Sequence, residues 1–302
     1  MKAPHHPLKY RIPMALTLSA LATAVLLCAG CPKNGTHTPS TNDNKNGAGK
    51  TDGKDPHHTS GADLEIPQKL PDIVAFAKKH SSAVDDAGRQ KATLEAVKKG
   101  LKQDPKNLEL LLLGMKAACR MGILSDTHAV MGGYGTQAMK WGKVAMALDP
   151  TKVEFPYYRA MGKAMKLQAN SKGALDKLPE VVTLAKKAIQ LDAKYDYAGP
   201  LRFLGALYVQ APEMGSIGDK DKGIDHLKKA VAHFPDYPIN RFYLGEAYYK
   251  DEQYDKAKKE LRKVLSPKDN APWSPRDRDY YQKKAKSYLK LIRRKQEAGM
   301  GV

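Results

Sequence analysis

Apolar side chains recur every third or fourth residue over most of the chain after Leu64, which is the period of a helix with one buried face. Amphipathic helices are predicted at Ala92–Leu101, Ala138–Leu148, Val181–Leu191 and Gly223–Phe234. Polar breaks accompany their ends at residues 103–105, 148–150, 191–193 and 233–235, with steps of 45, 43 and 42 residues. The pattern therefore predicts an all-α chain of about four degenerate helix-pair repeats between Leu70 and Leu265.

The partner helices of these pairs are less regular. Leu110–Gly122 and Phe155–Leu167 have the apolar spacing of helices, whereas Ile123–Thr136, which holds His128 and several glycines, is expected to be a loop between helices. A last helix is expected to begin at Ser274 and Pro275, which suit an N-cap and a first turn. Its apolar face and its many Lys and Arg residues indicate a capping helix with a polar outer side.

Two segments repeat a short motif. Leu204, Gly205 and Tyr208 read L-G-x-x-Y, and so do Leu244, Gly245 and Tyr248, with Ala257 at the small position of the following helix. These residues resemble the tetratricopeptide repeat (TPR), in which helix pairs stack into a superhelix with a concave groove. The fold class is thus expected to be a TPR-like α-solenoid, and the tyrosines and leucines are expected to lie in its core.

Positions beside the motif residues on the first helix of a TPR face the groove. Counted from Gly205 and Gly245, the candidate groove contacts are Arg202, Phe242, Glu246, Tyr249 and Lys250. Aromatic and Arg side chains often dominate binding energy in protein interfaces. The alternative is that each is simply an exposed or half-packed helix residue.

The N-terminus predicts export with a lipid anchor. Residues 1–30 hold a basic start and an apolar run, Ala15–Leu27, that is too short to span a bilayer. Small residues before Cys31 resemble a bacterial lipobox, so Cys31 is the expected acylation site; the alternative is a plain secretory signal. Pro32 after it favours the outer membrane, most simply on its periplasmic side. Residues 31–63 are polar and suit a tether, and residues 64–302 form the predicted helical domain.

Charge and chemistry narrow the function. The chain carries a net charge of +19, which would become +16 without residues 1–30. In an exported protein that charge suits anionic lipid or polymer rather than nucleic acid, although it also suits simple solubility. Cys119 would be the only unmodified thiol and is expected in the core. No catalytic or metal-ligand spacing is found, so neither an enzyme nor a cofactor is predicted.

One further resemblance covers Tyr157–Leu265. The stretch from Tyr197 through Gly199, Pro200 and Arg202 to Gly205 leads to Ala211-Pro212, then to Gly218-Asp219, and later to Asn240-Arg241. It resembles the T-component of TRAP transporters, a family of periplasmic TPR lipoproteins. That resemblance implies work beside a periplasmic solute-binding protein of such a transporter, with a small organic or hydrophobic ligand held or passed on.

Two hypotheses follow from the sequence. The first is a lipid-anchored TPR scaffold or adaptor that binds an envelope protein, with TRAP transport as one version. The second is a periplasmic binder of a small organic ligand or of an anionic envelope polymer, through a helical pocket or a basic surface. Polyanion binding should weaken steeply with salt, whereas groove binding should tolerate it.

Overall fold

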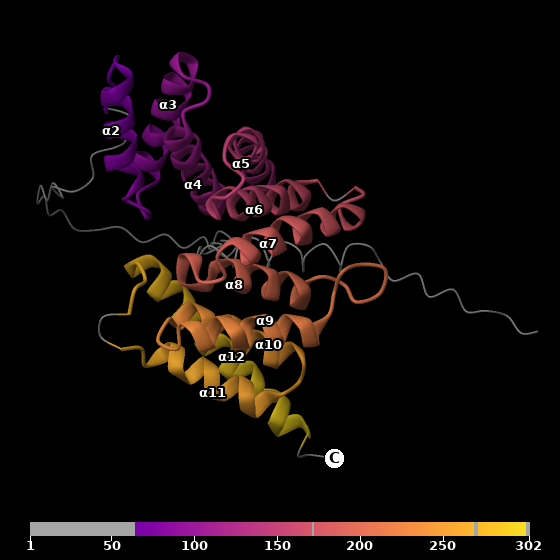
Figure 1. Cartoon of the computed structure of the whole chain (residues 1–302). Coiled ribbons are helices and arrows are strands. Elements are labelled where there is room, and N and C mark those ends of the chain that lie inside the picture. Colours follow the sequence, from indigo (N-terminus) through magenta and orange to yellow (C-terminus); the bar gives the residue numbers. More distant parts are fainter. Residues whose placement is uncertain (1–63, 171, 269–270, 300–302) are drawn as a thin grey trace, which may run out of the picture.

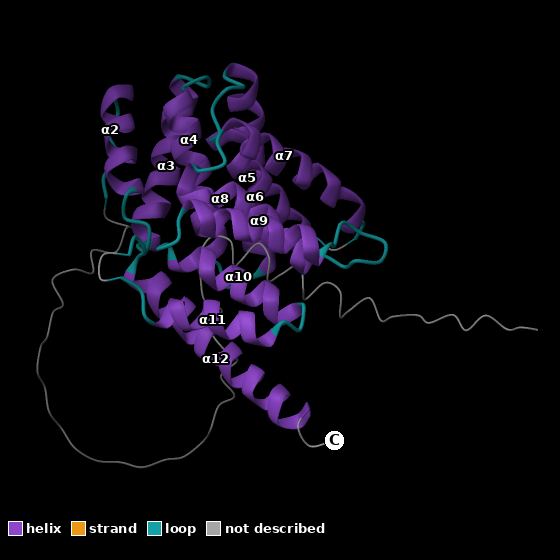
Figure 2. Ribbon diagram, turned by 60° about the horizontal axis from the view of Figure 1, so that its bottom comes forward, coloured by secondary structure: helices purple, strands orange, loops and turns teal. Residues whose placement is uncertain are grey.

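The computed structural model describes residues 64–170, 172–268 and 271–299 (Figure 1). Within these ranges the chain is helical, and no strand occurs (Figure 2). The helices are α2 (Leu70–Ser81), α3 (Ala87–Gln103), α4 (Leu108–Leu124), α5 (His128–Leu148), α6 (Glu154–Ala169), the 3₁₀ turn η2 (Leu175–Lys177), α7 (Leu178–Leu191), α8 (Tyr195–Gln210), α9 (Lys220–His233), α10 (Pro238–Lys250), α11 (Tyr254–Leu265) and α12 (Pro275–Gly299). The expected lipid anchor at Cys31 and the tether lie outside the described residues.

Consecutive helices form hairpins that stack in chain order, from α2 and α3 at one end to α10 and α11 at the other (Figure 1). Helix α12 packs on α10 and α11 and caps that end. The all-α solenoid predicted from the sequence is confirmed. The described residues form five helix pairs before the cap, one more than the four breaks suggested, because α10 and α11 form a pair after the last break.

Local polar groups explain where the helices start and stop. The side chains of Asp86, Asn107, Thr127 and Asp219 each accept a hydrogen bond from the backbone three residues ahead, at 2.9 to 3.3 Å. Such caps satisfy amide groups that a helix leaves unpaired at its start. Helices α3, α5, α7 and α9 end within one residue of the four predicted breaks.

The repeated motif residues pack as expected. Leu204, Tyr208, Leu244 and Ala257 are buried, and Tyr248 is half-buried against the core. A Cβ atom at Gly205 would lie 2.7 Å from Leu227 Cγ, and one at Gly245 would lie 2.8 Å from Leu261 Cγ. The two glycines therefore allow the second helix of each hairpin to approach the first closely.

The expectation of a loop at Ile123–Thr136 is wrong. Helix α4 continues to Leu124 and α5 begins at His128, so only three residues join them. Two of its glycines lie on the face of α5 that meets α6: a Cβ at Gly132 would sit 2.3 Å from Ala169 Cβ, and one at Gly135 would sit 2.5 Å from Gly162 O. They serve close helix packing rather than a turn.

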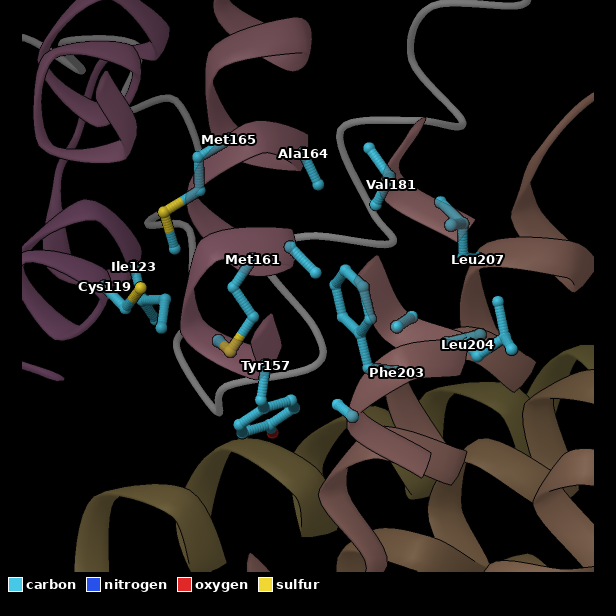
Figure 3. Close-up of a cluster of buried hydrophobic side chains, with 14 of the residues drawn as sticks. Cys119, Ile123, Tyr157, Met161, Ala164, Met165, Val181, Phe203, Leu204 and Leu207 are labelled. Carbon is cyan, nitrogen blue, oxygen red and sulfur yellow. The ribbon is translucent and has the colours of Figure 1, made fainter. Parts of the chain in front are cut away.

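A continuous apolar core joins the hairpins. Figure 3 shows Cys119 and Ile123 of α4 beside Met161 and Met165 of α6, with Phe203 of α8 on the far side. Tyr157 of α6 lies near Met161, at the edge of the side chains drawn in Figure 3. Among the described helices, none combines the length and the apolar character that a bilayer crossing requires.

Candidate functional site

The inner side of the superhelix holds a cavity of about 510 Å³. Its walls come from the first helices of successive hairpins (α4, α6, α8 and the start of α10), from the α2–α3 loop and from the start of α12. The lining residues are Ser81, Ser82, Val84, Gln90, Leu113, Lys116, Cys119, Arg120, Ile123, Tyr157, Tyr158, Met161, Tyr195, Asp196, Arg202, Tyr237, Ile239 and Asp277. We call this the inner cavity. Its volume falls in the range of small-molecule sites.

An unusual backbone segment forms one wall of the inner cavity. Asp196, Tyr197 and Ala198 have φ angles of 51°, 54° and 62°, in the left-handed region. None of them is glycine, so this conformation costs roughly 1 to 2 kcal/mol for each residue. We call these three residues the left-handed turn. It turns the chain into the main part of α8, which starts at Gly199 and Pro200, and it places the Asp196 carboxylate at the cavity.

Two buried polar side chains hold the left-handed turn. The Arg202 guanidinium donates to Asn240 Oδ1 at 2.8 Å and to Tyr197 O at 3.2 Å. Asn240 Nδ2 donates to the same Tyr197 carbonyl at 3.0 Å and to Ala230 O at 3.1 Å. Arg202 also lies over the ring of Tyr237, 5.3 Å from its centroid. These contacts offset the strain of the turn and join α8 to α10.

Close packing fixes the other side of the turn. Tyr157 Oη donates to Asp196 Oδ2 at 3.0 Å, and that carboxylate is also 3.5 Å from the Arg202 guanidinium. A Cβ atom at Gly199 would lie only 2.6 Å from Tyr157 Oη, so a side chain at this position would push α6 away from α8. Gly199, Arg202 and Asn240 together hold Asp196 against α6.

Three tyrosines form an aromatic wall beside Asp196. The ring centroids of Tyr157 and Tyr158 are 5.1 Å apart, those of Tyr157 and Tyr195 are 5.7 Å apart, and Tyr195 Oη donates to Tyr158 Oη at 3.3 Å. Burial raises the pKa of Tyr158 and of Tyr195. Both phenols are therefore neutral at physiological pH and act in hydrogen bonding and stacking rather than as bases.

Arg120 of α4 also lines the inner cavity. Its side chain donates to Val84 O at 2.6 Å and pairs with Asp85, both in the α2–α3 loop. It also lies 3.8 Å from the Asp277 carboxylate at the start of α12. Burial raises the pKa of Asp277 to about 6, against the opposing effect of Arg120. One side chain of α4 therefore links the first hairpin to the last helix.

Several polar groups of the inner cavity lack bonds within the described chain. Arg202 Nε is buried and has no hydrogen-bond partner there, and Asp277 Oδ1 has no hydrogen bond although Arg120 lies 3.8 Å from it. Lys116 lies 6.0 Å from the centroid of the Tyr158 ring and has no ion pair with a described carboxylate. Polar groups of this kind, set in a largely apolar and aromatic wall, can orient an organic ligand or a side chain of another protein.

Comparisons with known proteins identify the family. A family model described as the TRAP transporter T-component matches residues 124–293, more than half of the chain. The chain belongs to this family. The match covers the aromatic wall, the left-handed turn and Asp277, and it starts at the last residue of α4. No curated protein matches the sequence.

Solved structures place this T-component among TPR folds. The crystal structure of TTC0263, a thermophilic TPR protein of Thermus thermophilus, aligns with a TM-score of 0.54 and 22% identity over 73% of this chain and 99% of that one. Crystal structures of MamA align with TM-scores of 0.42, at 27% and 23% identity, over 62% and 68% of this chain and 92% and 100% of theirs. The first of these likenesses supports the fold alone, and the MamA alignments are too weak to support any argument.

The five candidate groove contacts of the T-component lie in different places. Arg202 lines the inner cavity, and Tyr249 and Lys250 are half-buried, with Lys250 bonded to the side chain of Gln210. Phe242 and Glu246 do not face an open groove, which corrects the expectation for these two residues. They are 0% and 2% exposed because α12 covers them.

Contacts with α12 explain this burial. The Phe242 ring lies 5.0 Å from that of Tyr281, and Tyr288 Oη donates to Glu246 Oε1 at 2.6 Å. Counting outward from a TPR motif gives the face that would be free in an isolated hairpin, and here the capping helix occupies that face.

Sequence reasoning did not find Tyr157, Tyr158, Asp196 or Asp277 as site residues. Their common location depends on the superhelix, which brings together residues up to 120 positions apart. A local signal existed for the turn, because Arg202 and Asn240 are polar residues inside segments that are otherwise apolar. Such residues are buried only when a specific partner is present.

Proposed function

We propose that this T-component is an interaction scaffold of a TRAP-type solute transporter and engages the transporter's solute-binding protein through the inner side of its superhelix. The observation that carries the proposal is the inner cavity itself, built from a strained turn that Arg202 and Asn240 hold in place. Strained backbone is concentrated at functional sites because a purely structural segment gains nothing from it. The family match supports the transporter context.

The proposal includes export and a lipid anchor at Cys31, on the outer membrane. Acylation at the end of a polar tether would keep the helical domain near the membrane while leaving it free to meet a periplasmic protein. The test is membrane fractionation of cells that produce the protein or its Cys31→Ser variant. After a high-salt wash, which removes proteins held only by charge, the variant is expected in the soluble fraction. A variant that stays on the washed membranes and still takes up labelled fatty acid would refute the anchor.

Site-specific photo-crosslinking tests the scaffold proposal. A photoreactive amino acid at Val84, which lines the inner cavity and is 46% exposed, should capture the solute-binding protein in cells. The matched control is the same amino acid at Val144, which is 40% exposed on α5 and is not part of the cavity wall. Capture from Val84 alone supports the proposal. Equal capture from both positions, or capture of proteins unrelated to a transporter, contradicts it.

A second candidate function is binding of a small organic ligand in the inner cavity. The cavity volume, the aromatic wall and Arg202 Nε, which has no hydrogen-bond partner among the described residues, favour it. Native mass spectrometry of the purified protein should then show an added mass that denaturation removes. Met161→Trp would fill the cavity with a larger side chain and should abolish that mass. Retention of the mass in this variant would place the ligand elsewhere.

A further inference from the structure

The positive charge of the chain is concentrated at one end of the solenoid. Residues 254–302 hold 15 Lys and Arg side chains against 6 Asp and Glu, a net charge of +9 out of +19. Residues 104–253, three times as many, contribute only +4, and residues 64–103 contribute +3. Both ends of a solenoid need a polar outer face for solubility. Solubility alone therefore does not explain why the α11–α12 end is so much more basic than the α2–α3 end.

Much of this charge lies along one side of α12. Lys283, Lys286, Lys290 and Arg294 are three or four residues apart, so they share a face, and all four are exposed. We call them the α12 basic stripe. The buried side of the same helix carries Tyr281, Ala285 and Ile292, so the stripe faces solvent. It spans about 16 Å of helix, given a rise of about 1.5 Å per residue.

Acidic residues lie near both ends of the stripe, since Asp279 lines the same hollow and Glu297 pairs with Arg293, but the stripe itself does not form the ion pairs that lysines form elsewhere in the fold. No ion pair with a described carboxylate involves its four members, whereas Lys229 of α9 pairs with Asp225 and Lys98 of α3 pairs with Glu95. Like charges at these spacings destabilise a helix. The stripe therefore keeps a repulsion that an anionic surface would relieve.

The shape and residue types of this face indicate what kind of surface. Lys283, Lys286 and Lys290 border an open hollow along α12 that no aromatic residue lines. Protein partners are usually anchored by buried aromatic or Arg side chains in pockets, which this hollow does not offer. Lysines are flexible point charges and suit mobile phosphate groups that need no fixed geometry. Leu291, exposed beside Lys290, adds an apolar side chain of the kind that inserts among lipids.

We infer that the α12 basic stripe docks on the surface of an anionic phospholipid bilayer. This contact would place the α11–α12 end of the solenoid against the membrane, and the α2–α3 end, which lies at the opposite end of the stack, would point away from it (Figure 1). It is independent of the proposed role in transport and of acylation at Cys31, since it depends only on charge in the described helices.

Vesicle co-sedimentation tests the inference. The full chain with Cys31→Ser is mixed with vesicles of phosphatidylcholine alone or with 30 to 40% phosphatidylglycerol, at about 50 and about 300 mM salt. The measured quantity is the ratio of the affinity for vesicles with phosphatidylglycerol to the affinity for vesicles without it. This ratio cancels binding by apolar segments, which is expected to be similar for both vesicle types. Each basic side chain near such a surface contributes about fivefold in affinity. Replacing all four stripe residues by Gln should therefore reduce the ratio about a hundredfold or more, and high salt should do the same.

A second variant separates the stripe from total charge. Lys91, Lys102, Lys186 and Lys228 are exposed, lie on other helices and have no described ion pair, so their replacement by Gln removes the same charge. Gln and Lys have similar helix propensity, and circular dichroism will show that both variants fold. The inference predicts near-normal vesicle binding for this control. Equal loss in both variants, or no gain from anionic lipid in the parent, would overturn it. Stripe-dependent binding to soluble polyphosphate without binding to vesicles would also overturn it and would make a soluble polyanion the partner.

Discussion

The left-handed turn should depend on the hydrogen-bonded pair that holds it. Arg202→Leu removes the donors to Tyr197 O and to Asn240 Oδ1, and the latter is left buried without a partner. Loss of a charge-assisted hydrogen bond and an unpaired buried acceptor together amount to about 3 kcal/mol. Asn240→Leu leaves Ala230 O without its side-chain donor and Arg202 without its acceptor, for about 2 to 3 kcal/mol. Each single variant should therefore lower the free energy of unfolding by a clearly measurable amount.

The double variant makes the prediction specific to the pair. With both side chains replaced, neither leaves the other unpaired, so the loss should be about 1 to 2 kcal/mol smaller than the sum of the single losses. Urea unfolding followed by circular dichroism and by fluorescence measures these values. The two tryptophans, Trp141 in α5 and Trp273 just before α12, report on both halves of the fold.

A matched control sets the scale. Arg262→Leu changes an exposed arginine of α11 that has no described ion pair, and it should alter the free energy of unfolding by no more than about 0.5 kcal/mol. If Arg202→Leu costs no more than this control, or if the Arg202 and Asn240 losses simply add, then the pair does not hold the turn and the account of the inner cavity is wrong.

Three other features of the fold give further predictions. Burial raises the pKa of Asp277 in the folded state from 3.8 to about 6, so ionisation of this carboxyl lowers the stability of the fold above pH 6, and this cost disappears as the pH falls towards 4. Asp277→Asn should therefore raise the free energy of unfolding, relative to the parent, by about 2 kcal/mol more at pH 7.5 than at pH 4.5. Urea unfolding at the two pH values measures this, and an equal effect at both would contradict the prediction. Gly205→Ala should lower the stability of the fold by about 1 to 3 kcal/mol, because the new Cβ would meet Leu227 and the backbone of α9. Gly133→Ala should raise it by about 0.5 to 1 kcal/mol, because nothing lies within 4 Å of that position. Thermal unfolding that shows the same sign for both variants would refute the packing argument. Burial raises the pKa of Cys119 to about 12, so the thiol should not react with iodoacetamide at pH 8 in the native protein. Peptide mapping should find it unmodified in the native protein and alkylated in urea. Alkylation of the native protein would show that the thiol is accessible.

The sequence was sufficient for the repeat architecture because that architecture is encoded locally. Each helix pair carries its own apolar face, its caps and a polar break, and the ends of α3, α5, α7 and α9 follow from these signals within a residue. The start of α5 was missed for a physical reason. Gly132 and Gly135 have the composition of a loop, and only the position of α6 against them shows that they allow close contact between two helices.

The candidate site was only partly predictable because it is a property of the stacked hairpins. Arg202 was selected as a possible contact, yet its bonds to Tyr197 and Asn240 could not be read from spacing. The left-handed turn contains no glycine, which is the residue that normally marks such a conformation. Phe242 and Glu246 were misplaced since no local pattern shows that α12 returns over α10.

The contacts of Arg120 with the first interhelical loop and with Asp277 limit how this protein can change over evolution. In an open solenoid each repeat contacts only its neighbours, so a hairpin can be duplicated or lost with little effect on distant repeats. Here the superhelix must return to the same place for Asp277 to reach Arg120. Inserting or deleting one hairpin between α4 and α12 would shift the capping helix by a full repeat and open the cavity. The contact between Arg120 and Asp277 therefore fixes the number of hairpins that can lie between them.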